Sequence, residues 1–212
     1  MKNGQHIGFW LTLVCIIFLL GPLMRKGDDM RTFVFYEIAQ TRAAFGDSVV
    51  DSVLTWANGM YEVSPLARVA DTAKGLKHTQ KEKDLSKLVA GPLGAASSYA
   101  LNSYLDGMAL AAFVVAIRAA VVGIWIALMA PLLLAAAHDG FCQRKIKLAE
   151  FGKLRPATFT MAGMVVIPLI CAPIVYLVIP YPLSPMLIPA WACIVAMPIS
   201  IMVSNMQQLF GR

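Results

Sequence analysis

The sequence predicts an all-α integral membrane protein with about four transmembrane helices and an extramembrane helical subdomain between the first and second spans. Hydrophobic residues make up 58% of the 212-residue chain and charged residues 14%, whereas soluble domains hold about 45–50% and about 25%. The apolar residues gather into runs long enough to cross a bilayer. No alternation of apolar and polar residues predicts a β-strand.

The first apolar run covers Ile7 to Met24, about 18 residues, which is just long enough to span. Lys2 precedes it, so a cleaved signal peptide is one interpretation. We favour a retained membrane anchor over residues 1–24, because the apolar core exceeds that of a typical signal peptide and no A-x-A cleavage site follows.

Residues 25–106 hold ten Lys or Arg and ten Asp or Glu, which indicates a solvated, extramembrane segment on the periplasmic side. Helical spacing places six apolar residues on one face of an amphipathic helix: Ile38, Phe45, Val49, Val53, Trp56 and Met60. Ser64-Pro65 predicts the start of a shorter helix to about Lys74, and residues 74–84 predict a charged link. Exposed members of the apolar face, such as Trp56, are candidate anchors for a partner.

The second apolar run predicts one long helix over residues 107–138, about 46 Å for its 31 apolar residues. Because a hydrocarbon core is about 30 Å thick, the whole run exceeds one span. The segment from Ala119 to Ala137 carries no charge and is long enough to span the membrane by itself. Arg118 is then expected at the outer boundary, where it can snorkel to the headgroups. Asp139-Gly140 predicts the end of the helix, with Gly140 in the left-handed position.

Residues 139–156 predict a basic cytoplasmic link, because short loops rich in Lys and Arg face the cytoplasm. It reads as a short helix beside anionic lipid, with Phe151 in the interface. A topological anchor is one interpretation and a docking surface for a cytoplasmic partner is the other; the two can coexist. The candidate contact residues are Asp139, Gly140, Arg144, Lys145, Lys147, Phe151 and Arg155.

Residues 157–212 predict a proline-rich transmembrane hairpin with spans at about 157–179 and 186–204. Four prolines, at 180, 182, 185 and 189, interrupt the helical pattern between them. Four spans and a cytoplasmic link place both termini inside and residues 25–106 outside. The Arg25-Lys26 pair argues against this orientation, but charge bias weakens beside long outer segments.

The sequence indicates no enzyme, cofactor or metal site. It contains no nucleophile, metalloprotease or phosphate-loop motif, and its four cysteines follow no disulfide or zinc spacing. The net charge of +6 reflects topology and anionic headgroups better than direct nucleic-acid binding, for which no recognition motif is present. The oligomeric state stays open, self-association included.

The stretch "DGFCQRKIKLAEFGKLRPATF", followed by "IPYPLSPMLIPAW", resembles the DUF4400 family of membrane proteins from integrative conjugative elements and conjugative plasmids. Asp139, Gly140, Arg144, Lys145, Phe151, Gly152 and Pro156 occupy the positions of the family pattern. The resemblance implies a multi-pass protein of the bacterial inner membrane that takes part in conjugative DNA transfer.

The resemblance also implies a non-enzymatic accessory or scaffold of the type IV secretion machinery. Its partners would be other conjugation membrane proteins, among them the coupling ATPase. Two other functions remain open at this point: a small channel or carrier lined by the proline-kinked spans, and an entry-exclusion factor that acts through the outer segment.

Overall fold

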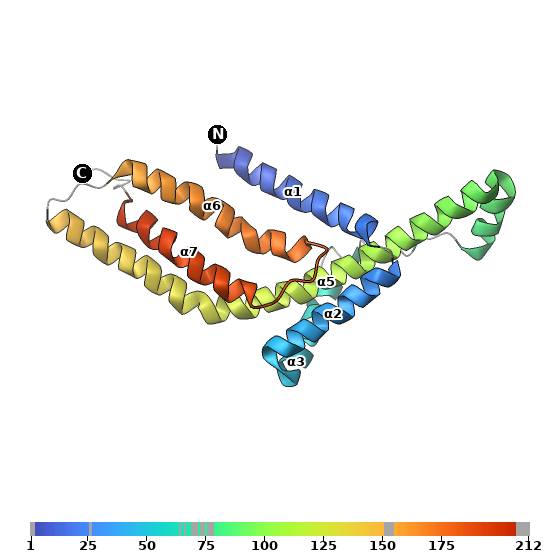
Figure 1. Ribbon diagram of the computed structural model, residues 1–212, viewed down its shortest axis with the longest axis horizontal. Coiled ribbons are helices and arrows are strands. Elements are labelled where there is room, and N and C mark those ends of the chain that lie inside the picture. The colour runs from blue at the N-terminus through green and yellow to red at the C-terminus, as the bar shows by residue number, and fades with distance from the viewer. Residues whose placement is uncertain are drawn as a thin grey trace. The chain divides into compact units, whose positions relative to one another are not determined.

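The computed structural model describes residues 3–25, 27–63, 65, 67–68, 72, 75, 79–150 and 155–206. Every regular element among these residues is a helix, which confirms the all-α class (Figure 1). The elements are α1 (Asn3–Met24), α2 (Gly27–Phe45), α3 (Asp47–Val63), α5 (Gln80–Ala149), α6 (Pro156–Val178) and α7 (Leu187–Ser204).

Among the described residues, three helices are long and apolar enough to cross a membrane: Ala96–Ala149 within α5, Pro156–Val178 and Leu187–Ser204. The predicted first span meets the same criterion only together with the helix after it, Gly8–Met24 with Asp29–Phe45, bent by 116°. A multi-pass membrane protein therefore fits the helices, and the fourth span stays a prediction.

The chain divides into two compact units. The first unit comprises Met1–Val121 and Ile174–Ser184, and the second comprises Val122–Pro173 and Pro185–Arg212. The end of α6 and the proline-rich turn after it thus belong with α1, α2, α3 and the first half of α5.

The core of the first unit forms where α2 packs against α5. Its buried residues recur at helical spacing on each helix, as an apolar face requires: Met30, Phe33 and Val34 on α2, and Ala111 and Val114 on α5. Tyr61 of α3 meets Phe113 edge to face with ring centroids 5.9 Å apart. A Cβ on Gly107 would lie 3.0 Å from Pro22 of α1, so α5 passes α1 closely there.

The predicted amphipathic helix is broken into two. Gly46 has φ 81°, and its N–H donates to the carbonyl of Arg42 at 2.8 Å, so it ends α2 in the left-handed conformation that glycine tolerates. In α3 the buried residues are Val50, Val53 and Ala57. The predicted face therefore does not continue across the break, and Trp56 and Met60 are exposed.

Most of the predicted helix after Ser64 lies outside the described residues, and so do residues 74 and 76–78 of the predicted charged link. The prediction of a link is wrong from Gln80 onward, because α5 already begins at that residue. The Thr79 N–H donates to Glu82 Oε2 at 2.7 Å, as in a capping box, and this bond fixes the start of the helix.

Within the second unit, α6 and α7 are joined by a bond from a tryptophan to a backbone carbonyl. The indole N–H of Trp191 donates to the carbonyl of Leu169 at 2.6 Å. Such bonds satisfy polar groups inside an apolar helix pair. Trp191 therefore contributes to the packing of α6 against α7.

Candidate functional site

Arg118 is the most deeply buried large side chain of the first unit, and the prediction that it snorkels to headgroups is wrong. Its exposed fraction is 0%. It lies on α5 among apolar residues, where an unpaired charge would cost several kcal/mol. The fold therefore has to supply partners for all five N–H groups of the guanidinium.

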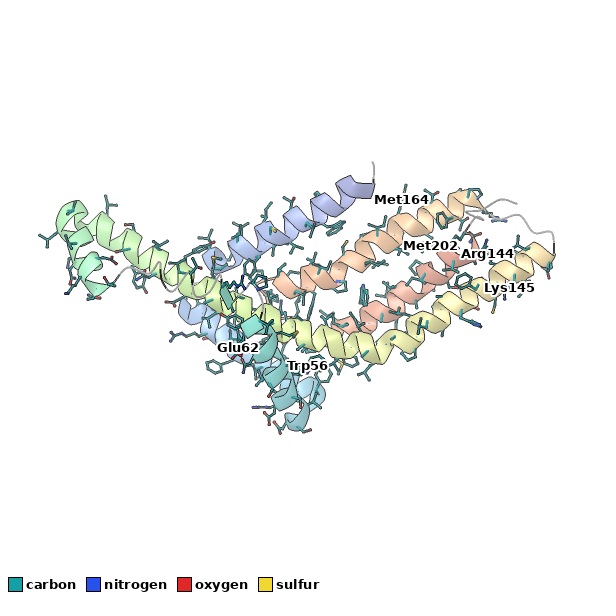
Figure 2. The ribbon with its side chains drawn as sticks, turned by 180° about the vertical axis from the view of Figure 1, so that it is seen from behind. Trp56, Glu62, Arg144, Lys145, Met164 and Met202 are labelled. Atoms are coloured by element: carbon teal, nitrogen blue, oxygen red, sulfur yellow. The ribbon has the colours of Figure 1, made fainter. Side chains whose placement is uncertain are left out.

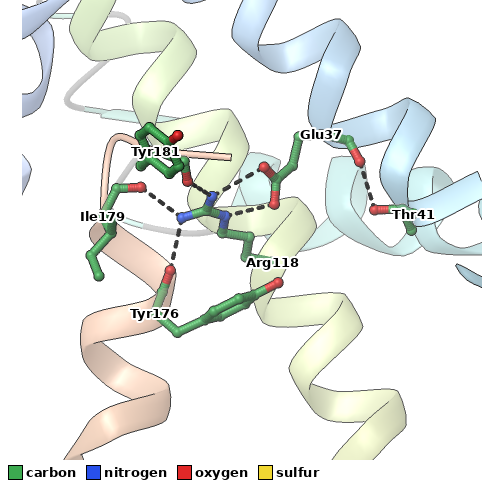
Figure 3. Close-up of polar contacts among 6 residues, drawn as sticks. All are labelled: Glu37, Thr41, Arg118, Tyr176, Ile179 and Tyr181. Carbon is green, nitrogen blue, oxygen red and sulfur yellow. Dashed lines mark hydrogen bonds and ion pairs between the residues drawn. The ribbon is translucent and has the colours of Figure 1, made fainter. Parts of the chain in front are cut away.

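Glu37 of α2 and three backbone carbonyls supply these partners (Figure 3). Arg118 Nε donates to Glu37 Oε1 at 2.8 Å and Nη2 donates to Oε2 at 3.0 Å, a bidentate pair. Nη1 donates to the carbonyls of Tyr176 and Ile179 at 2.8 and 2.7 Å, and Nη2 to that of Tyr181 at 2.6 Å. We call these five residues the Arg118 cluster.

Prolines explain why the end of α6 needs an arginine. In a continuing helix the carbonyl of Tyr176 would accept from the N–H of residue 180, but Pro180 has none. The last carbonyls of a helix also carry its negative dipole end, which favours a cation. The rings of Tyr176 and Phe33 lie 5.1 and 5.5 Å from the guanidinium carbon, close enough for cation–π attraction.

Sequence reasoning missed this cluster, although a signal was present. Glu37 lies at helical spacing from Met30, Phe33 and Thr41, all of them buried. An acidic residue on an apolar face needs a cation, and Arg118 is the base within the next long apolar run. The two residues are 81 positions apart, so no local pattern joins them.

Asp139 and Gly140 do not end a helix; they lie inside α5, which continues to Ala149. A Cβ on Gly140 would lie 2.7 Å from the carbonyl oxygen of Ser200, so α5 and α7 meet backbone to backbone. The Ser200 hydroxyl donates to Asp139 Oδ2 at 2.8 Å. Packing against α7 overrides the local stop signal, as small residues allow in membrane helices.

The predicted basic residues divide into two kinds. Lys147 Nζ donates to Ser204 Oγ at 3.3 Å and to Asn205 Oδ1 at 3.4 Å, at the end of α7. Arg144 is half-buried and its Nε has no hydrogen-bond partner among the described residues. Lys145 and Arg155 are exposed, and Figure 2 labels the consecutive residues Arg144 and Lys145 near the end of α5. Phe151 lies outside the described residues.

Trp56 is 63% exposed on α3, and its role as a partner anchor stays a prediction. Val63, one helical heptad later, and Met60 are exposed beside it. Figure 2 labels Trp56 and Glu62, which lie on the same helix, α3. Among the described residues no three His, Cys, Asp or Glu side chains gather as metal ligands would.

The structure defines a class of protein: a helical chain in which three of the described helices are long and apolar enough to cross a membrane and an ion pair is buried. The family model "IncC plasmid conjugative DNA transfer protein DtrJ-like" matches residues 33–210. The chain belongs to this DtrJ-like family, which confirms the predicted association with conjugative DNA transfer. No curated protein and no solved structure matches the chain.

Proposed function

We propose that the chain is a non-enzymatic scaffold or accessory protein of the bacterial inner membrane in a type IV secretion system for conjugation. Membership of the DtrJ-like family supports a role in conjugative DNA transfer. We also propose, from the resemblance noted in the sequence, that the chain is related to the DUF4400 proteins of integrative conjugative elements.

The Arg118 cluster is the observation that carries the scaffold role. It joins α2, α5 and the end of α6 through five hydrogen bonds, of which three are buried and two are partly buried. A hairpin held in this way presents its exposed side chains in a fixed geometry, and such preorganisation lowers the entropic cost of binding a partner. Trp56 is the exposed side chain best suited to contact another subunit of the mating apparatus.

On the cytoplasmic side, Lys145 and Arg155 are the candidate contacts with the coupling ATPase or with anionic lipid. Both are exposed, whereas Lys147 is engaged with the end of α7. Reversal of Lys147 or Arg144 would therefore disturb helix packing as well as docking. A clean test of docking uses the two exposed residues alone.

The combined change Lys145→Glu and Arg155→Glu is expected to lower conjugative transfer from the donor by about tenfold or more, because each reversal turns attraction into repulsion. The matched control is Lys81→Glu with Lys87→Glu, the same charge change at exposed positions of α5. Transfer frequency is measured with plasmids that carry each variant.

Orientation has to be monitored because basic residues also determine topology. Cys142 is exposed and reports orientation to an impermeant thiol reagent, in a background with the other three cysteines changed to serine. Normal transfer by a correctly oriented Lys145→Glu, Arg155→Glu variant would contradict the docking role.

Trp56→Ala is expected to leave folding unchanged and to lower transfer about thirtyfold, the effect of losing a hot-spot contact of about 2 kcal/mol. The stability of the purified variant, measured by thermal unfolding, should match the parent because the side chain is 63% exposed. Trp56→Phe keeps an aromatic anchor and should retain most transfer. Equal transfer by the Ala and parent proteins would exclude Trp56 from the contact.

A further inference from the structure

A polar groove lies in the first unit where α1, α2 and the proline-rich turn meet. Its volume is about 410 Å³, and it is lined by Met24, Arg25, Asp29, Thr32, Pro180 and Tyr181. Two of these residues carry opposite charges. The chemistry of the lining therefore has to indicate the class of ligand.

Arg25 is held in place within this groove. Its Nε donates to the carbonyl of Pro180 at 2.9 Å, and its guanidinium carbon lies 4.7 Å from the centroid of the Phe33 ring. The bond to Pro180 uses the Nε–H of the guanidinium, and the Phe33 ring covers one face of it. Among the described residues, no side chain pairs with its terminal nitrogens.

Asp29 lies in the first turn of α2 and is exposed. It forms no ion pair with Arg25, although both line the same groove. A cation and an anion that face one groove without pairing suit a zwitterion, whose phosphate meets the guanidinium and whose ammonium group meets the carboxylate.

The position of the groove matches the level of phospholipid headgroups. Arg25 follows directly on the apolar run of α1, and Tyr181 is 63% exposed, as expected for a ring at the membrane interface. Met24, Leu20 and Ile16 are exposed at intervals of four residues on α1. They form one apolar face that leads away from the groove, and an acyl chain can lie along it.

We propose that this groove binds the headgroup of a phospholipid with a primary ammonium group, of the phosphatidylethanolamine class. Arg25 binds the phosphate, Asp29 accepts hydrogen bonds from the ammonium group, and the apolar face of α1 supports an acyl chain. Phosphatidylcholine has no N–H to donate to Asp29, and phosphatidylglycerol has no cation to offset its negative charge. Both should bind more weakly.

The test titrates the full-length protein, purified in a mild detergent, with three phospholipids of identical acyl chains, and native mass spectrometry counts the bound lipid. The expected result is a preference for phosphatidylethanolamine of about fivefold over the other two, the value of one partly exposed charged hydrogen bond. Equal binding of the three lipids would overturn the proposal.

Asp29→Asn should remove the preference over phosphatidylglycerol, and Asp51→Asn, an exposed acid on α3, should keep it. Arg25→Gln should weaken all three lipids; because it also loses a structural contact, Arg25→Lys, which keeps the charge, should retain binding. A preference that survives Asp29→Asn would refute the role of that carboxylate. Soluble phosphoethanolamine at equal concentration should not displace the lipid, and displacement would refute the acyl-chain contact.

Discussion

Replacement of Glu37 by glutamine is expected to lower the free energy of unfolding by about 3–5 kcal/mol, because it leaves Arg118 charged and buried without its counter-ion. Arg118 and Glu37 expose only 1% and 2% of their side chains, so water cannot compensate for the lost pair. The measurement is the unfolding midpoint of the purified protein in detergent, followed by circular dichroism.

The matched control is Asp51→Asn, the equivalent change of an exposed acid on α3, which should shift stability by less than about 0.5 kcal/mol. Arg118→Lys should also destabilise, since lysine has three donors for the acceptors that arginine satisfies with five. The double change of Glu37 and Arg118 to methionine should recover only part of the loss, because the carbonyls of Tyr176, Ile179 and Tyr181 then lack donors. Parent-like stability of Glu37→Gln would show that the pair does not hold the unit together.

Apolar run length predicted the membrane helices of the hairpin well. The expected spans at about 157–179 and 186–204 correspond to Pro156–Val178 and Leu187–Ser204. Length and composition suffice here because each helix must satisfy its own backbone hydrogen bonds in lipid, and the flanking prolines end it. The prediction succeeded because it used only the length and composition of each apolar run, which are local properties of the sequence.

Contacts between distant segments could not be predicted in the same way. The Asp139-Gly140 pair has the composition of a helix end, and only the approach of α7, sixty residues later, explains why the helix continues. Lys147 counted as one more exposed base in the sequence, yet it is bonded to Ser204 and Asn205. A count of basic residues does not show which of them bind other side chains of the same chain. Only a basic side chain without such a contact is available to bind a partner protein.

Gly140→Ala is expected to destabilise the second unit by about 1–3 kcal/mol, the cost of overpacking a tight site. The new Cβ would lie 2.7 Å from the Ser200 carbonyl oxygen and 2.8 Å from Val203 Cβ. The nearest of these atoms belongs to the backbone, so a side-chain rotation cannot relieve the contact. α7 has to move away, and the bond from Ser200 Oγ to Asp139 Oδ2 lengthens.

Gly163→Ala on α6 is the control, since a Cβ there would meet nothing within 4 Å. The same substitution in that open helical position should be neutral or stabilising by up to about 1 kcal/mol, because alanine favours helices. Opposite signs for the two variants, measured by unfolding in one detergent, would assign Gly140 to helix contact. Equal effects of the two substitutions would show that the close approach of α7 does not constrain Gly140.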